Sequence, residues 1–164
     1  MRVKIFSIII LTVFISCKTD KPKINKKSDF VKTWFDTVRM VPFESKLIIN
    51  ENKTFDYLGG ACTSSFFSKG YWKIKEDTLI LTSSKIDKCY WKENFGPICF
   101  TNEEIEKMQE DNKTIKNCKP IGEESYVFFN QEKFYLRNDT LIHARENKNC
   151  PNLRIALSSI KKIK

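Results

Sequence analysis

Few residues in this 164-residue chain could do chemistry, and their spacing matches no catalytic motif. His143 is the only histidine, and neither G-x-S-x-G nor H-E-x-x-H occurs. Glu103, Glu104 and Glu106 are most simply the solvated face of a short helix, with no sign of the paired carboxylates of a hydrolase. One imidazole cannot supply a nucleophile, a base and an orienting group together. The sequence therefore predicts no catalytic residues and no enzymatic activity.

The first seventeen residues are typical of a secretory signal that ends at a cysteine. Arg2 and Lys4 supply a positive start, and an apolar run over residues 5–15 follows. This run is too short to span a bilayer stably. The small residue Ser16 then precedes Cys17, which places a cleavage site directly before the cysteine. Export out of the cytoplasm is therefore predicted.

Residues 14–17 resemble the lipobox of bacterial lipoproteins, although the first of them is phenylalanine where leucine is usual. The resemblance implies that residues 1–16 are removed, that Cys17 carries a lipid, and that residues 17–28 form a basic tether to the membrane. Because Lys18 is not the aspartate that marks inner-membrane retention, the outer membrane is favoured, with the domain facing the periplasm or the cell surface. An ordinary cleaved signal with an unmodified cysteine is the alternative.

The other five cysteines predict disulfide bonds, because an exported protein folds under oxidising conditions. Five thiols can form two bridges with one left over, and the sequence does not choose the pairing. We expect at least one bridge to pin the segment 85–122 to the rest of the domain, a contribution of about 2–4 kcal/mol. Zinc is the weaker idea because no C-x-x-C pair occurs, so no metal and no cofactor are predicted. The disulfide candidates are Cys62, Cys89, Cys99, Cys118 and Cys150.

A β-hairpin signal occurs twice in the chain. The residues Asp-Thr-Leu-Ile at 77–80 recur at 139–142, and each copy follows a run that alternates apolar and polar residues. When the two copies are aligned, His143 replaces Leu81. If Leu81 faces the interior, His143 places a titratable group among apolar side chains; a strand-end histidine that faces solvent is the alternative. The repeat predicts two hairpins of equal register.

Eight strand-like runs predict a single β-rich domain over residues 29–164. Its fold class would be mainly β: a small antiparallel up-and-down barrel, or a sandwich, of about eight strands. Residues 29–35 have the spacing of a helical turn that plugs an apolar opening. A capping box at 101–104 predicts a short helix to about residue 111, within an insertion over residues 85–122. The predicted strands cover residues 41–50, 54–57, 66–75, 78–84, 125–129, 133–137, 140–144 and 153–159.

The strand pattern resembles that of small lipocalin-like lipoproteins of Gram-negative envelopes. Residues 70–72 have the Gly-X-Trp form of that family, but its signature lies on the first strand, where this chain has Lys-Thr-Trp at 32–34. The resemblance covers residues 33–84 best and 125–160 less well. It implies an up-and-down barrel, and it favours a binding function only by analogy of fold.

Two functions stay open for such a domain. The first is non-catalytic binding of a small or amphipathic ligand, for which Trp72, Phe134 and His143 are the candidate residues. The second is a protein-binding module, either a periplasmic inhibitor or a toxin-immunity lipoprotein, whose surface would be the insertion at 85–122. The formal net charge of +9 disfavours a basic partner, and we expect no binding to nucleic acid.

Two surface features have competing explanations. Basic and aromatic residues mix between residues 88 and 100, where they could stack on sugars or form a satellite core beneath a loop. Three Asp-Thr pairs resemble the acceptor used for O-glycosylation in some Gram-negative envelopes, although hairpin turns explain two of them. The threonines concerned are Thr37, Thr78 and Thr140.

Overall fold

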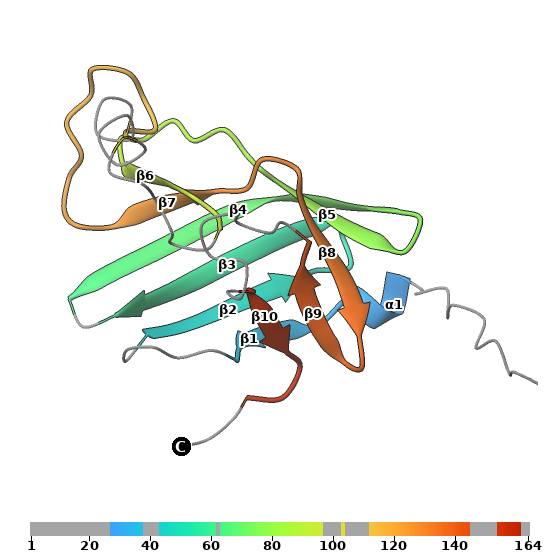
Figure 1. Cartoon of the computed structure of the whole chain (residues 1–164). Helices are drawn as coiled ribbons and strands as arrows, with labels where there is room; N and C mark the ends of the chain where they lie inside the picture. The colour runs from blue at the N-terminus through green and yellow to red at the C-terminus, as the bar shows by residue number, and fades with distance from the viewer. Residues whose placement is uncertain are drawn as a thin grey trace, which may run out of the picture.

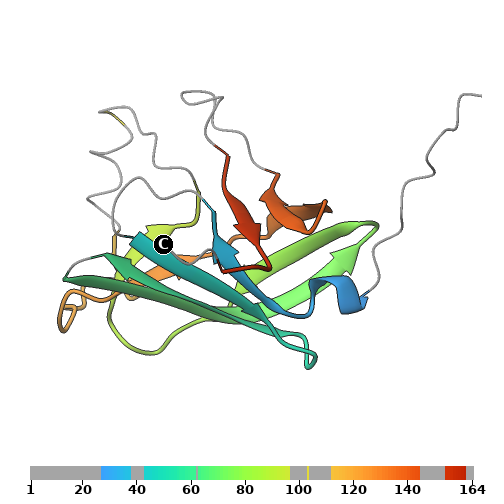
Figure 2. The same ribbon diagram turned by 90° about the horizontal axis from the view of Figure 1, so that it is seen from below.

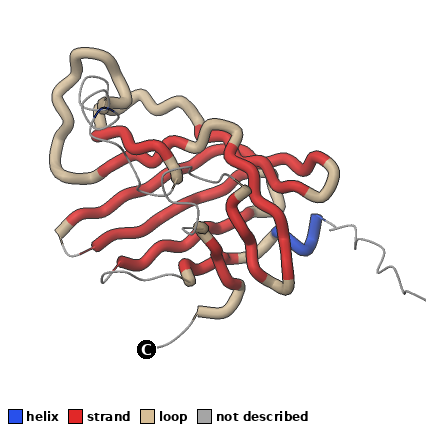
Figure 3. Tube along the Cα trace, viewed as in Figure 1, coloured by secondary structure: helices blue, strands red, loops and turns tan. Residues whose placement is uncertain are grey.

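The computed structural model describes residues 27–37, 43–61, 63–96, 103, 112–144 and 154–161. These residues form a short helix and a ten-stranded sheet that curls until it meets itself (Figure 1 and Figure 3). No helix in these ranges is long and apolar enough to cross a bilayer. The elements are α1 (Lys27–Phe30), β1 (Thr33–Asp36), β2 (Phe43–Ile49), β3 (Thr54–Ala61), β4 (Ser64–Lys75), β5 (Thr78–Ser83), β6 (Trp91–Asn94), β7 (Ser125–Phe128), β8 (Glu132–Arg137), β9 (Thr140–His143) and β10 (Ala156–Ser158).

Eight of the strands form a closed antiparallel barrel. Going along the chain through β1, β2, β3, β4, β5, β8, β9 and β10, each strand pairs with the next, and β10 pairs with β1. Closure removes the unpaired edges that an open sheet would present. The prediction of a mainly β, up-and-down barrel is confirmed, and the sandwich is not adopted. Figure 2 shows α1 and the β4–β5 turn toward one end of the molecule and β6 and β7 toward the other.

The first barrel strand falls where the sequence predicts a helical turn. Helix α1 ends at Phe30, and Trp34 and Phe35 lie in β1, so the turn predicted over 29–35 is wrong beyond Phe30. The indole Nε1 of Trp34 donates a 3.0 Å hydrogen bond to the carbonyl of Phe30, and both side chains are fully buried. Because β1 pairs with β2 on one side and β10 on the other, ladder formation outweighs the helical spacing of the apolar residues.

Strand β7 lies outside the barrel, although residues 125–129 are predicted to be one of its strands. The twelve-residue β4 is long enough to share one edge: β5 pairs along residues 70–75, and β7 pairs in parallel near the start of β4. Strand β6 pairs in parallel with the far edge of β7. The hydroxyl of Tyr126 lies 3.0 Å from the carbonyl of Lys69 and 2.8 Å from that of Ser84, which fixes β7 against the barrel.

The repeated segment forms two hairpins of the same register, as predicted. Trp72 pairs with Leu81 across β4 and β5, and Phe134 pairs with His143 across β8 and β9. Each hairpin turns through two residues, and the first residue of each turn has a positive φ. That geometry suits two-residue turns, because their twist then matches the twist of the strands. The helix predicted over 101–111 lies outside the described residues, apart from Glu103.

Apolar side chains from every barrel strand fill the interior. One inward position on β4 is Gly70, where a Cβ atom would collide with the carbonyl oxygen of Thr82 and the ring of Phe55. Glycine therefore leaves room for the ring of Phe55, which lies directly across from it on β3. The largest fully buried apolar side chains are Trp34, Phe30, Phe55, Phe129, Phe134, Leu47, Ile49, Leu79, Leu81, Leu141 and Leu157.

Candidate functional site at the barrel mouth

The barrel interior is apolar at the α1 end and polar at the opposite end. Helix α1 places the buried ring of Phe30 under the first end. At the opposite end, where β8 begins and β9 finishes, inward positions carry Glu132 and His143. We call this end the barrel mouth and define it by the side chains of Tyr57, Phe95, Glu132, Phe134 and His143.

His143 and Glu132 form a buried pair, because the alternation of β8 and β9 turns both side chains inward. His143 is 2% exposed and Glu132 is 7% exposed, and Nε2 of His143 lies 2.7 Å from Oε2 of Glu132. With Glu132 as a carboxylate, Nε2–H is the donor, and the neutral ring keeps a lone pair on Nδ1. That Nδ1 is buried and has no hydrogen-bond partner among the described residues. The mouth therefore contains an unmet hydrogen-bonding atom, which is uncommon in a folded protein.

The insertion closes the mouth with one aromatic ring. Phe95 follows β6 and is 6% exposed, and its ring stacks on Phe129 with the centroids 4.3 Å apart. The same ring lies edge-on to the imidazole of His143 at 5.1 Å, and its centroid is 5.6 Å from those of Tyr57 and Phe134. Aromatic pairs in such geometries contribute about 0.5–1.5 kcal/mol each beyond the area they bury. The ring of Phe95 thus joins the insertion to the barrel core.

Tyr57 brings a hydroxyl group to the mouth, with acidic side chains near it. Burial raises the pKa of Tyr57 to about 12, against the effect of a hydrogen bond with Ser45. The charges of Asp36 and Glu93 also raise this pKa, because they disfavour a second negative charge close by. Asp36 and Glu93 are thus close enough to act on the Tyr57 hydroxyl, and Glu132 is a further carboxylate at the mouth.

The disulfide joins Cys89 to Cys118, both of them in the insertion. This bridge closes the insertion on itself and does not pin it to the barrel, and the expectation that at least one bridge does so stays a prediction. The reason is local: the two arms of the insertion pair at Trp91 and Lys113, and this brings the two thiols together. The other cysteines lie outside the described residues: Cys17, Cys62, Cys99 and Cys150.

The three candidate ligand-binding residues lie in two places. Phe134 and His143 lie together at the mouth, with ring centroids 5.0 Å apart. Trp72 lies against the turn at the other end, where its Nε1 donates a 2.9 Å hydrogen bond to the carbonyl of Asn50. The ammonium of Lys53 sits 4.2 Å from the Trp72 ring centroid. His143 thus faces the interior and not solvent, and any ligand role for these residues stays a prediction.

Sequence reasoning missed Glu132, and for the aromatic residues between 88 and 100, Phe95 among them, it offered a stacking surface or a satellite core, whereas Phe95 lies in the main core. A signal for Glu132 existed, because in the aligned copies it replaces Gly70 just as His143 replaces Leu81. Both departures fall on inward positions, and paired polar residues there indicate a partnership. Phe95 sits in a loop without periodicity, so no local pattern reveals that its ring enters the core.

Comparison of the chain with protein-family models, with curated proteins and with solved structures finds no match. The class of protein is therefore defined by the fold: an eight-stranded, antiparallel, up-and-down β-barrel with two parallel strands and a disulfide in its insertion. Within the described ranges, no group of three or more His, Cys, Asp or Glu side chains could hold a metal ion.

Proposed function

We propose that the protein is a non-catalytic envelope lipoprotein whose barrel mouth binds a small amphipathic molecule. Nδ1 of His143 carries this proposal, as a buried atom without a hydrogen-bond partner among the described residues. Beside it lies the ring of Phe95, which the insertion supplies and the barrel does not. Small-molecule sites are mostly apolar with a few placed polar groups, and the mouth has that composition.

The ligand that fits is an apolar ring or chain carrying one hydroxyl group. Its hydroxyl would donate to Nδ1 of His143, while Glu132 holds the ring tautomer through Nε2. Its apolar part would take the place of the Phe95 ring and contact Phe129 and Phe134. Phe95 belongs to the insertion, so its ring can leave while all eight barrel strands keep their pairing.

1-Naphthol and naphthalene are matched probes, because they differ by one hydroxyl group. We expect the full chain to bind 1-naphthol about tenfold more tightly than naphthalene, since only the former satisfies Nδ1. Phe95→Ala should bind both probes more tightly, because no side chain then competes for the site. Glu132→Met with His143→Leu should abolish the preference. Fluorescence titration measures all three, and no binding by either the wild-type chain or Phe95→Ala would refute the proposal.

The lipid anchor is a separate part of the proposal, supported by the charge, length and cysteine position of residues 1–17. Mass spectrometry of the protein extracted from membranes should find Cys17 at the N-terminus, carrying a diacylglyceryl group. Cys17→Ala should release the domain from the membrane or leave the signal uncleaved. An intact, unacylated N-terminal segment in the membrane fraction would refute lipidation and leave the ligand site untouched.

A second candidate function is a protein-binding module that uses the insertion. Three apolar side chains of the insertion are exposed: Trp91 by 37%, Ile115 by 38% and Ile121 by 89%. Trp91 and Ile115 lie within the loop that Cys89 and Cys118 close, and exposed tryptophans are frequent binding anchors in protein interfaces. Deleting the insertion is a poor test, because Phe95 would leave the core with it.

Surface substitutions test the second candidate without disturbing the core. Replacing Trp91, Ile115 and Ile121 by serine should remove any partner captured in stoichiometric amount from envelope extracts. Serine at three exposed apolar positions outside the insertion provides the control: Leu58, Tyr71 and Ile160. The same partners captured by all three proteins would count against this function.

A further inference from the structure

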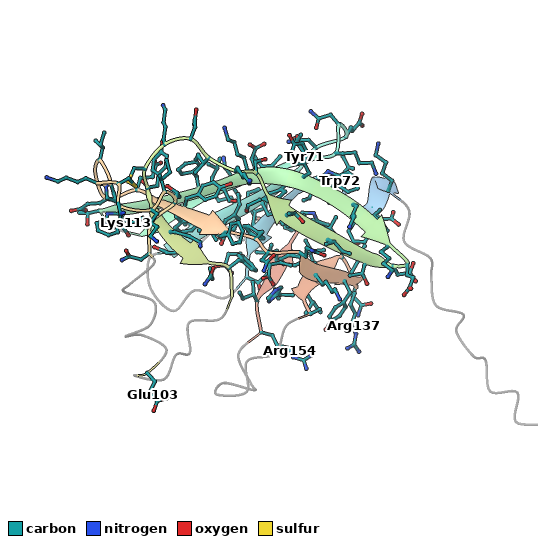
Figure 4. The ribbon with its side chains drawn as sticks, turned by 90° about the horizontal axis from the view of Figure 1, so that it is seen from above. Tyr71, Trp72, Glu103, Lys113, Arg137 and Arg154 are labelled. Atoms are coloured by element: carbon teal, nitrogen blue, oxygen red, sulfur yellow. A yellow bond between two sulfur atoms is a disulfide. The ribbon has the colours of Figure 1, made fainter. Side chains whose placement is uncertain are left out.

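The outer wall of the barrel over β4, β5 and β8 is strongly basic. Its outward positions carry five exposed cations and, on the strands themselves, no acidic residue. In Figure 4, Tyr71 is labelled above β4 and Arg137 below the β8–β9 hairpin, at the two margins of this surface. We call this surface the basic wall and define its charge by Lys69, Lys73, Lys75, Lys133 and Arg137.

The cations form two rows with an uncharged row between them. Lys73 on β4 and Lys133 on β8 are the direct neighbours of Ile80 on β5. The other outward residues of β5, Thr78 and Thr82, are also uncharged. Ile80 is 6% exposed although it faces outward, since the methylene stems of the two lysines flank it and can cover it. The wall therefore combines long cationic side chains with a hydroxyl-bearing and apolar centre.

The neighbouring surface over β2 and β3 differs in charge, and its Asp56 lies directly across from Lys69 on β4. The charged outward residues of β2 and β3 are Glu44, Lys46 and Asp56, and Glu44 lies 3.7 Å from Lys161 in a salt bridge. By contrast, no salt bridge between described residues involves any of the five cations of the basic wall. In the strand pairings only Lys69 has an acid directly across from it, Asp56, and Lys73, Lys75, Lys133 and Arg137 have uncharged partners. The excess of cations creates a positive field directed at one side of the molecule.

We propose that the basic wall docks the barrel, on its side, against an anionic phospholipid surface. The wall is the convex exterior of a barrel, so a flat, deformable surface can meet both rows of cations at once. Lysine side chains are long enough to reach headgroups on either side of the β5 row, and Tyr71, which is 62% exposed, suits the water–membrane boundary. Each lysine or arginine near an anionic leaflet strengthens attachment about fivefold.

This orientation is independent of the lipid anchor and leaves the mouth free. The mouth lies at an end of the barrel and the basic wall lies along its side, so a ligand could still enter while the wall faces the membrane. Attachment through charge should weaken as salt increases, because exposed charges are screened beyond about 8 Å at physiological ionic strength.

Acetylation of lysines in the full chain, followed by mass spectrometry, tests the docking directly. Vesicles of phosphatidylcholine with phosphatidylglycerol should slow the acetylation of Lys73 and Lys133 several-fold compared with vesicles of phosphatidylcholine alone. Lys46 and Lys116 provide internal controls, because both are exposed and lie outside the basic wall. Equal protection of all four lysines, or of none, would overturn the proposal.

Matched variants give a second readout. Lys73→Gln with Lys133→Gln should weaken binding to the anionic vesicles about 30-fold, whereas Lys46→Gln with Lys116→Gln, of the same net charge, should change it less than threefold. Equal losses in the two variants would show a general effect of charge and overturn the assignment. If a soluble anionic polysaccharide protects Lys73 and Lys133 and vesicles do not, the basic wall binds a glycan and the proposal of a lipid surface is overturned.

Discussion

The hairpins β4–β5 and β8–β9 share one pattern and one register, yet at two inward positions the second has polar residues where the first has none. The first hairpin has Gly70 and Leu81, and the second has Glu132 and His143 at the equivalent places. In the first, the missing side chain makes room for the ring of Phe55. In the second, the two polar side chains bind each other at 2.7 Å. The same backbone geometry therefore supports close packing in the first hairpin, whereas in the second it buries Nδ1 of His143 without a hydrogen-bond partner among the described residues.

Glu132 and His143 are compatible with the core only when both are present, because each is the hydrogen-bond partner of the other. Removing one partner of a buried, hydrogen-bonded pair that contains a charge is strongly destabilising, while replacing both partners by apolar residues of similar size is often neutral or stabilising. A polar pair at such a position therefore indicates a role other than stability.

The largest effect is expected from breaking the pair. His143→Leu alone should lower the free energy of unfolding by about 3–5 kcal/mol, because Glu132 stays buried and loses its hydrogen bond to Nε2 of His143. The double variant Glu132→Met with His143→Leu should recover most of this loss, since it gives the second hairpin the apolar character of the first. Urea denaturation measures both. A double variant no more stable than His143→Leu would contradict the comparison.

Removing the ring that closes the mouth should have the next largest effect. Phe95→Ala should lower stability by about 3 kcal/mol, because the ring contacts four aromatic or imidazole rings of the core. Tyr71→Ala is the control, since that ring is 62% exposed and its loss should change stability by less than about 0.5 kcal/mol. If the two variants unfold at the same urea concentration, Phe95 does not hold the insertion in the core.

Opening the disulfide should have a comparable or smaller effect. Cys89→Ser with Cys118→Ser frees a loop closed over a separation of 29 residues, which predicts a loss of about 2–4 kcal/mol. Because the bridge closes the insertion on itself, hydrogen exchange should quicken in residues 88–92 and 112–119 while the barrel strands keep their protection. Equal loss of protection in β8 and β9 would show that the bridge supports the barrel after all.

Alkaline pH should destabilise the protein through Tyr57. Its pKa is about 12 in the folded state against an ordinary value of 10.0, so the folded state holds the phenolic proton more tightly. The resulting stability is present below pH 10 and is lost as the pH rises from 10 through 12, with about 1.4 kcal/mol gone at pH 11. Urea denaturation at pH 8 and pH 11 measures the decrease in the free energy of unfolding. This decrease should be about 1.4 kcal/mol smaller in Tyr57→Phe than in the wild type. Identical pH dependence in the two proteins would contradict burial of the hydroxyl.

The smallest effect concerns the two turns. Glu76 opens the first turn with a φ of 55°, whereas Asn138 holds the equivalent place in the second with a φ of 47°. Asparagine tolerates positive φ better than glutamate, so Glu76→Asn should stabilise the protein by about 0.5 kcal/mol and Asn138→Glu should destabilise it by a similar amount. Chemical denaturation resolves such shifts, and changes of the same sign would contradict the equivalence of the turns.

The sequence predicted what depends on local periodicity. Alternation with a period of two defined most barrel strands, and the repeat defined the register that turns His143 inward. It could not predict β1, because the spacing of Trp34 and Phe35 suits a helix until β2 and β10 pair on either side of them. The Cys89–Cys118 pairing and the entry of Phe95 into the core were equally out of reach, since both are set by contacts between distant segments of the insertion.

The ring nitrogens of His143 give the most direct test of the ligand site. This chain has one imidazole, so its ¹⁵N ring signals are unambiguous in a long-range ¹H–¹⁵N spectrum. Without ligand, Nε2 should be protonated and Nδ1 unprotonated. Adding 1-naphthol should shift the Nδ1 signal and leave the Nε2 signal nearly unchanged. Naphthalene should leave both signals in place. If the ring ¹⁵N signals of His143 do not shift at saturating 1-naphthol, in the wild type and in Phe95→Ala, there is no binding site at the barrel mouth.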